Sequence, residues 1–304
     1  MADFRSGFVS VVGRPNVGKS SLINTMIGEK IVITSAKPQT TRNRTRAILT
    51  TPQAQIVFYD TPGLHKPQHR LGEEMNRIAL QTFTMVDTVL WVIDVTRAPG
   101  KGDLWVADRL GELVGYTRAG SSDHVLVAFN KIDLVSEFSP EAFLQEVGVS
   151  DLPWVRISAL TGEGIPLLLE RLTGSLPVGP KYYPEEMITD QPEALIISDL
   201  IREGIIDQTA EEIPHSVAVM VEEMRDRPKR MVYIRATVLV ERDSQKKIMI
   251  GKSGERLRQI GISGRKAIEE YLGQPVYLDL WVKTKADWRN SPEALRSEER
   301  RVGK

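Results

Sequence analysis

The chain has 304 residues, of which 41% are hydrophobic and 26% charged, and this length and composition are typical of a globular protein with two domains. Its 40 basic residues balance its 40 acidic ones, which excludes a strong overall field, so any surface for nucleic acid or membrane must be local. It lacks cysteine, which excludes disulfides and thiol nucleophiles, and has no apolar run near the roughly 20 residues that cross a bilayer, so we expect a cytoplasmic, non-secreted protein.

Short apolar runs alternate with helical patterns over the first part of the chain. We expect strands at 8–12, 55–59, 88–93, 125–129 and 154–157, and helices at 20–27, 71–85, 104–114, 140–147 and 165–172. Most of these strands are almost wholly apolar, which is typical of parallel strands that helices cover on both faces. The sequence therefore predicts an α/β domain over residues 1–176 with a mostly parallel sheet.

A second pattern begins after a proline-rich stretch, which predicts a linker at 177–192. Beyond it we expect, in order, a helix at 194–206, alternating strands at 217–221 and 232–240, helical segments up to Leu272 and a last strand at 275–283. This order predicts an α+β domain at 193–285, followed by a charged tail at 286–304.

Residues 13–20 read Gly-Arg-Pro-Asn-Val-Gly-Lys-Ser and match the pattern GxxxxGK[ST] between a strand and a helix. The glycines allow backbone N–H groups to surround phosphate oxygens at a helix N-terminus. Lys19 is expected to reach the β- and γ-phosphates, and the Ser20 hydroxyl to bind Mg²⁺. The predicted phosphate-binding residues are Gly13, Arg14, Pro15, Asn16, Val17, Gly18, Lys19, Ser20 and Ser21.

Two further segments follow neighbouring strands and indicate guanine rather than adenine. Asp133 can accept hydrogen bonds from guanine N1–H and the N2 amine, which adenine does not offer in that geometry. Lys131 is expected to pack over the base, Asn130 to tie this loop to the phosphate loop, and the Ala159 N–H to donate to guanine O6. The predicted base-binding residues are Asn130, Lys131, Asp133, Ser158, Ala159 and Leu160.

The segment that ends the strand at 55–59 reads Asp60-Thr61-Pro62-Gly63, and all four residues are predicted to bind nucleotide. Asp60 is expected to hold Mg²⁺ through water, and Gly63 to donate its N–H to the γ-phosphate as part of a loop that relaxes after hydrolysis. In the polar loop at 37–42, Thr41 is preferred to Thr40 as a further Mg²⁺ ligand. The groups predicted to act in catalysis are Lys19, Thr41 and Gly63.

Through the motifs at 13–21, 38–42, 60–63, 130–133 and 158–160, the chain resembles the translation-factor-like GTPases and, within them, the Era family. The resemblance implies hydrolysis of GTP to GDP and phosphate with Mg²⁺. Leu64 stands where many switch GTPases have a water-orienting glutamine, which predicts slow turnover, on the order of 10⁻² s⁻¹ or less. Asn16 resembles the asparagine that coordinates a potassium ion in related GTPases, so we hypothesise K⁺-stimulated hydrolysis.

The Gly-Lys-Ser-Gly at 251–254 lies between helical stretches, and the α-β-β-α-α-β order around it resembles a type II KH domain, which grips single-stranded RNA. Between residues 242 and 266 there are eight basic residues and two acidic ones, which favours contact with phosphates. The predicted RNA-binding residues are Ile250, Gly251, Lys252, Ser253, Gly254, Arg256 and Arg258.

The Era resemblance also implies binding to the 3′ region of 16S rRNA, a role in maturation of the 30S ribosomal subunit, and peripheral association with the cytoplasmic face of the inner membrane. We expect a monomer in which GTP orders the loops at about 31–45 and 60–85 and so repositions the RNA-binding domain. Two alternatives stay open: a metabolic phosphotransferase that uses the same phosphate loop, and an RNA-binding protein whose nucleotide site is only structural.

Overall fold

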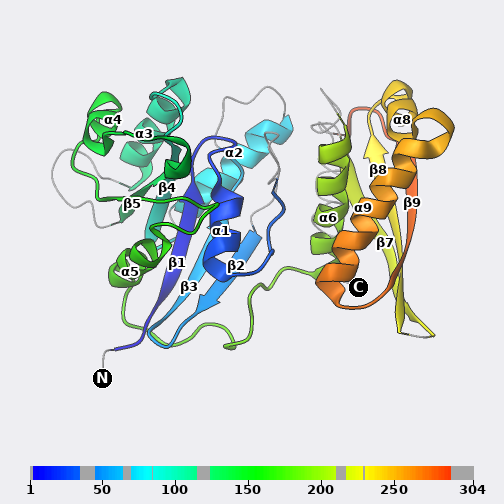
Figure 1. Cartoon of the computed structure of the whole chain (residues 1–304), viewed down its shortest axis with the longest axis horizontal. Coiled ribbons are helices and arrows are strands. Elements are labelled where there is room, and N and C mark those ends of the chain that lie inside the picture. The colour runs from blue at the N-terminus through cyan, green and yellow to red at the C-terminus, as the bar shows by residue number, and fades with distance from the viewer. Residues whose placement is uncertain are drawn as a thin grey trace. The chain divides into compact units, whose positions relative to one another are not determined.

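The computed structural model describes residues 3–34, 45–63, 70–83, 85–114, 124–209, 217–228 and 230–288. Contacts within the chain divide it into two units that meet along the sequence at Asp190 and Gln191. Figure 1 shows an α/β unit followed by a smaller α+β unit, and each is treated separately below.

The described residues of the first unit form a sheet of six strands (Figure 1). In chain order the strands are β1 Arg5–Val12, β2 Thr45–Thr50, β3 Ala54–Asp60, β4 Thr88–Asp94, β5 Val125–Asn130 and β6 Trp154–Arg156. In space the order is β2-β3-β1-β4-β5-β6, and every pair is parallel except β2–β3. The predicted, mostly parallel sheet is therefore confirmed, and its carboxyl edge gathers the loops in which ligands bind in such folds.

Five helices of the described residues cover this sheet: α1 Lys19–Ile27, α2 Arg70–Phe83, α3 Lys101–Val114, α4 Pro140–Glu146 and α5 Ile165–Ser175. Apolar residues of α1 and α5 pack in one core cluster, and those of α2, α3 and α4 in a second. Strand β4 shows the alternation: Leu90 and Val92 belong to the first cluster, whereas Val89, Trp91 and Ile93 belong to the second. Both faces of the strand are buried, which explains the continuous apolar runs.

Two features of this unit differ from the sequence analysis. The edge strand β2 was not predicted, because its residues, Thr-Arg-Ala-Ile-Leu-Thr, mix polar and apolar side chains without a regular alternation. The stretch expected as a linker contacts the sheet, because the Ile48 N–H donates to the Ile188 carbonyl at 2.8 Å. The fully buried Gln55 side chain accepts from the N–H groups of Tyr182 and Tyr183, at 2.6 and 2.9 Å, and donates to the Tyr183 carbonyl at 2.9 Å.

The second unit has the predicted α-β-β-α-α-β order. Its elements are α6 Glu193–Gln208, β7 Ala218–Arg227, β8 Met231–Val240, α8 Asp243–Ile250, a 3₁₀ turn Lys252–Gly254, α9 Glu255–Leu272 and β9 Val276–Thr284. Strand β8 lies between β7, which is antiparallel to it, and β9, which is parallel. Helices α6 and α9 pack side by side (Figure 1), where Gly264 of α9 faces Ile201 of α6.

No helix in the part of the chain that the structure describes combines the length and the apolar character needed to cross a membrane.

Candidate functional site

The loop between β1 and α1 has a backbone that only certain residues adopt. Gly13 and Gly18 have φ values of +147° and +98°. A Cβ atom at Gly13 would lie 2.3 Å from the Val92 carbonyl oxygen, and one at Gly18 would lie 2.3 Å from Asn130 Nδ2. Glycine is therefore required at both positions by conformation and by space. The loop runs directly into α1, so its N–H groups and the helix N-terminus face the same region.

Lys19, the first residue of α1, is held at the open side of this loop. Its Nζ donates to the carbonyls of Gly13 at 3.3 Å and Arg14 at 3.1 Å. Burial lowers the pKa of Lys19 to about 8, although the nearby charge of Asp60 opposes this effect. An anionic phosphate in the loop would favour the ammonium form again. This geometry places the Lys19 ammonium group where it can bind a phosphate group held in the loop.

Ser20 and Asp60 bring together the kind of oxygens that Mg²⁺ prefers. Ser20 Oγ donates to Asp60 Oδ2 at 2.9 Å, and Asp60 is fully buried at the end of β3. The adjacent Thr61 donates its hydroxyl to the Val11 carbonyl at 2.7 Å, which holds this segment beside β1. A hydroxyl and a carboxylate oxygen fit Mg²⁺ as ligands. Thr41, the further predicted ligand, and Leu64 lie outside the described residues.

Gly63 lies against the phosphate loop. A Cβ atom there would be 2.8 Å from Pro15 N and 2.9 Å from Pro15 Cα, and Pro62 beside it is buried. The structure thus brings the segment at 60–63 into direct contact with the loop at 13–20, as two elements that share a ligand require.

Asn130 joins the phosphate loop to the base-selecting loops. Its Nδ2 donates to the Val17 carbonyl at 2.8 Å, and its Oδ1 accepts from the Ala159 N–H at 2.9 Å. The first bond is the tie that the sequence predicted. The second bond is made by the Ala159 N–H, which we expected to face guanine O6 and which donates to Asn130 in this structure.

Asp133 is oriented by a neighbouring serine. Ser158 Oγ, which is fully buried, donates to Asp133 Oδ1 at 2.6 Å. The Asp133 residue itself is exposed, so its carboxylate is accessible to a base. Leu160 is 84% exposed, and an apolar side chain so exposed is available to pack on a ring. The two base-selecting loops therefore meet, as their positions after β5 and β6 predicted.

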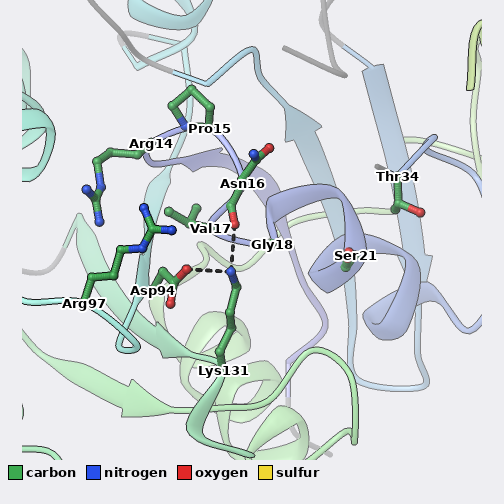
Figure 2. Close-up of a pocket in the computed structure, with 10 residues that line it drawn as sticks. All are labelled: Arg14, Pro15, Asn16, Val17, Gly18, Ser21, Thr34, Asp94, Arg97 and Lys131. Carbon is green, nitrogen blue, oxygen red and sulfur yellow. Dashed lines mark hydrogen bonds and ion pairs between the residues drawn. The ribbon is translucent and has the colours of Figure 1, made fainter. Parts of the chain in front are cut away.

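Lys131 is fixed by a residue that the sequence analysis missed. Its Nζ donates to the Asn16 carbonyl at 2.9 Å and pairs with Asp94 Oδ2 at 2.5 Å (Figure 2). Burial opposes ionisation of Asp94, but hydrogen bonds from Lys131 and Thr96 outweigh it and lower the pKa of Asp94. Asp94 ends the apolar strand β4, between the ends of β1 and β5 in the sheet. An acidic residue at that position was the signal that could have identified it.

Arg14 lines the pocket and also contacts α3. Its Nε pairs with Asp103 Oδ1 at 2.9 Å, and the Asp103 side chain is only 1% exposed. The backbone of Arg14 remains part of the phosphate loop, while its side chain contacts another element.

These residues surround a cavity of about 850 Å³, a size typical of ligand sites. Figure 2 shows the ten residues that line it, which are Arg14, Pro15, Asn16, Val17, Gly18, Ser21, Thr34, Asp94, Arg97 and Lys131. The phosphate loop and Lys131 were predicted to share a ligand. Thr34, Asp94 and Arg97 were not, because none belongs to a recognisable motif.

In the second unit, the Gly-Lys-Ser-Gly turn joins α8 to α9 with an unusual backbone. Gly251, Ser253 and Gly254 have φ values of +74°, +53° and +80°. A Cβ atom at Gly251 would lie 2.8 Å from Arg256 Cβ, whereas one at Gly254 would meet nothing within 4 Å. Lys252 and Ser253 are exposed. The loop therefore presents open backbone and a lysine to solvent.

Two of the predicted RNA contacts are partly occupied by the protein itself. Arg256 Nη1 donates to the Ile248 carbonyl at 2.6 Å, and Arg258 pairs with Glu255 at 2.9 Å. The hydrogen bond from Arg258 is the main reason that the pKa of Glu255 is lowered to about 2. Ile248 and Ile262, at 45% and 42% exposure, add apolar surface on the two helices that flank the loop.

A family model described as "50S ribosome-binding GTPase" matches residues 8–131, and a "KH domain" model matches residues 212–289. The GTPase Era of Alkaliphilus oremlandii (strain OhILAs) is 46% identical to this chain, over 97% of the chain and 98% of the relative. The chain belongs to the Era family of GTPases.

Other Era proteins are similar to this chain over nearly its whole length. The GTPase Era of Heliobacterium modesticaldum (strain ATCC 51547 / Ice1) is 43% identical over 98% of this chain and 97% of the relative. A crystal structure of Era in complex with MgGDPNP and nucleotides 1506–1542 of 16S ribosomal RNA superposes with a TM-score of 0.88, at 37% identity, over 97% of this chain and 98% of that one. An Aquifex aeolicus Era variant bound to GDP and AlF₄⁻ gives the same TM-score at 36% identity and the same coverage.

As an Era GTPase, the chain binds GTP and GDP with Mg²⁺ and hydrolyses GTP to GDP and phosphate. Its fold is the P-loop GTPase domain followed by a KH domain, as the motifs predicted. Family membership also displaces the phosphotransferase alternative, since the chain matches Era relatives over nearly its whole length.

Proposed function

We propose that this protein is a GTP-controlled switch that binds the 3′ region of 16S rRNA through its KH domain and assists biogenesis of the 30S subunit. The observation that carries the proposal is the similarity of 97% of the chain to an Era complex that contains both MgGDPNP and nucleotides 1506–1542 of 16S rRNA. The exposed loop at 251–254 and the basic residues around it support the RNA-binding half.

In the proposed reaction, Lys19 stabilises the negative charge that develops on the β- and γ-phosphates. Its place between the Gly13 and Arg14 carbonyls supports this role. Ser20 and Thr41 would bind Mg²⁺ directly and Asp60 through water, and the ion when bound neutralises charge between the β- and γ-phosphates. The 2.9 Å approach of Ser20 Oγ to Asp60 supports their part of this site.

Guanine recognition is assigned to the loops after β5 and β6. Asp133, oriented by Ser158, would accept from guanine N1–H and N2. Lys131 would cover one face of the base. For Ala159 to donate to O6, its N–H must leave Asn130 Oδ1 when the nucleotide enters, so that bond is a part of the site that we expect to rearrange.

Gly63 would donate its N–H to the γ-phosphate and so report whether that phosphate is present. Its contact with Pro15 supports a position within reach of the phosphate loop. Because Leu64 carries no group that can orient water, we expect slow intrinsic turnover, with Asn16 supporting a stimulating potassium ion.

RNA binding would follow the KH pattern, in which backbone N–H groups of the loop contact phosphates and bases lie on the apolar surface beside it. The left-handed backbone at Gly251 and Gly254 and the exposed Lys252 support the phosphate contacts. Ile248 and Ile262 support the apolar surface. Arg256 and Arg258 would have to exchange protein partners for phosphate.

Titrating a fluorescent RNA of the 16S 3′ sequence with the protein, in a non-hydrolysable GTP analogue and in GDP, tests the proposal. We expect tighter binding in the analogue by at least about fivefold, which is the low end of typical coupling between two sites. Equal affinities in the two states would mean that the nucleotide does not control RNA binding. They would favour the alternative of an RNA-binding protein whose nucleotide site is only structural.

The contribution of the KH loop is tested separately with Lys252→Ala. Loss of one phosphate contact should weaken RNA binding several-fold and lower the salt dependence by about one ion. Lys285→Ala is the matched control, because Lys285 is an exposed lysine of the same unit outside the loop. A Lys252→Ala protein that binds like Lys285→Ala would refute RNA binding by this loop.

At the cellular level, we propose that the protein acts as a monomer, associates with the 30S subunit and attaches peripherally to the inner membrane. Depletion of the protein should then lead to accumulation of immature small-subunit rRNA. Fractionation should place the protein with the 30S particle, and a salt-extractable fraction with the membrane. Recovery of all the protein away from both fractions would contradict the cellular part of the proposal.

A further inference from the structure

An ion pair links the phosphate loop to α3. Its acidic residue, Asp103, belongs to none of the motifs by which the sequence resembles the family. Arg14 Nε lies 2.9 Å from Asp103 Oδ1, with the Arg14 side chain 22% exposed and the Asp103 side chain 1% exposed. The other carboxylate oxygen of Asp103 accepts the Gly100 N–H at 2.9 Å. Asp103 thus binds the N-terminal turn of α3 with one oxygen and the phosphate loop with the other.

The first turn of α3 is shaped to receive the arginine. A Cβ atom at Gly102 would lie 2.5 Å from Arg14 Cδ and 3.1 Å from Cγ, and one at Gly100 would lie 3.4 Å from Arg14 Nη1. The stem of Arg14 therefore rests on the backbone of Gly102, where any larger residue would displace it. Gly100, Gly102 and Asp103 form what we call the arginine cradle.

The cradle holds the part of the phosphate loop that precedes α1. Arg14 offers its carbonyl to Lys19 Nζ at 3.1 Å, and Pro15, the next residue, is in contact with Gly63. Because Lys19 is the residue that reaches the β- and γ-phosphates, Arg14 and Pro15 lie beside the γ-phosphate end of the site.

We infer that the ion pair between Arg14 and Asp103 positions the phosphate loop for the γ-phosphate, which makes Asp103 a positioning residue for GTP hydrolysis. The inference concerns the hydrolysis that defines the family and does not depend on RNA binding. It predicts a selective effect: loss of the pair affects GTP and its turnover more than it affects GDP.

Asp103 is poorly suited to a purely stabilising role. Burial raises the pKa of Asp103 above its ordinary value, although the Gly100 N–H and the charge of Arg14 oppose this effect. A carboxyl group with a raised folded-state pKa opposes folding as the pH rises through that pKa, and does so fully above it. Replacing Asp103 with an uncharged isostere removes this cost, and an amide oxygen can still accept the Gly100 N–H, so we expect little change in the stability of the fold.

The test compares Asp103→Asn with Glu112→Gln, an exposed carboxyl-to-amide change on the same helix, at a surface pair with Arg109. The readouts are kcat, the Kd values for GDP and for a non-hydrolysable GTP analogue, and the melting temperature. For Asp103→Asn we expect kcat to fall about tenfold or more, as small misplacements of reacting groups do. We expect the analogue to bind several-fold more weakly, GDP to bind within about twofold of the parent, and the melting temperature to change little. Glu112→Gln should match the parent in every readout.

If either single variant is unexpectedly unstable, a double-mutant cycle that combines Asp103→Asn with Arg14→Gln still tests whether the two residues act through their ion pair. If the two residues act only through their pair, the double variant should lose no more turnover than the worse single variant. Additive losses, an equal weakening of GDP and analogue, or unchanged kcat in Asp103→Asn would each overturn the inference.

Discussion

Gly18 is a position in the phosphate loop that leaves no room for a side chain. Its φ of +98°, and the 2.3 Å that would separate a Cβ atom from Asn130 Nδ2, exclude any side chain. We expect Gly18→Ala to lower GDP affinity at least tenfold, because the strain and the displaced Asn130 act on the loop together. Gly28→Ala is the control, since Gly28 has a φ of +83° but nothing within 4 Å of a Cβ. It should lower stability by about 1 kcal/mol and leave GDP affinity unchanged; equal losses in titration calorimetry would contradict the steric argument.

Asp133 offers a test of base selection. In Asp133→Asn, one acceptor oxygen becomes an amide donor, which suits xanthine better than guanine. We expect preference to move from GTP towards xanthosine triphosphate by at least about tenfold in competition binding. Asn at this position can still accept from Ser158 Oγ, so the loop should stay folded. Retained selectivity for GTP would refute the assignment of Asp133.

Asn16 carries the potassium hypothesis. Its carbonyl accepts from Lys131, and Figure 2 shows its side chain extending away from that lysine. We expect faster GTP hydrolysis in K⁺ than in Na⁺ of equal ionic strength, and loss of that difference in Asn16→Ala, because the amide oxygen is a suitable ligand for a monovalent cation. Phosphate-release assays in the two salts measure both effects, and equal rates in the parent would rule out the hypothesis.

Among the elements, β3 and the segment after α5 are joined by Gln55. This fully buried amide makes three hydrogen bonds to backbone groups of Tyr182 and Tyr183. Gln55→Ala leaves those groups unpaired, at about 1–3 kcal/mol for each that stays buried. After partial relaxation we expect a loss of about 2–4 kcal/mol in the free energy of unfolding, measured by urea denaturation. Gln53→Ala, an exposed glutamine in the adjoining turn, should change it by less than about 0.5 kcal/mol.

For the whole molecule, the same contacts bear on where the nucleotide-binding unit ends. Ile188 packs against the core of the first unit, and Arg46 pairs with Asp190 at 2.7 Å. We expect a fragment of residues 1–190 to bind GDP with a higher melting temperature than a fragment of residues 1–176. A thermal-shift assay with and without GDP measures the difference. Equal melting temperatures would mean that residues 177–190 contribute nothing to the unit.

The sequence predicted the fold because apolar runs alternate with helical patterns along the first unit, and because the phosphate-loop motif lies between a strand and a helix. It did not predict β2, whose polar and apolar residues do not alternate regularly, or the contacts of Gln55, which join residues more than a hundred positions apart. In the site, motif spacing fixes the backbone positions of Lys19, Asp60 and Asn130, so the sequence could place them at one edge of the sheet. Asp94 and Asp103 were missed since their roles depend on which strand and helix ends are neighbours, which only the folded sheet determines.

The arginine cradle has a consequence for how such a chain can change over generations. A residue larger than glycine at position 102 would displace the Arg14 side chain. A neutral residue at position 103 would remove the charge partner of Arg14. Neither change is tolerated easily while Arg14 remains, so a lineage should lose or keep the three residues together. Across aligned Era sequences we expect positions 14, 102 and 103 to co-vary, although 102 and 103 are nearly ninety residues distant from 14 in the chain.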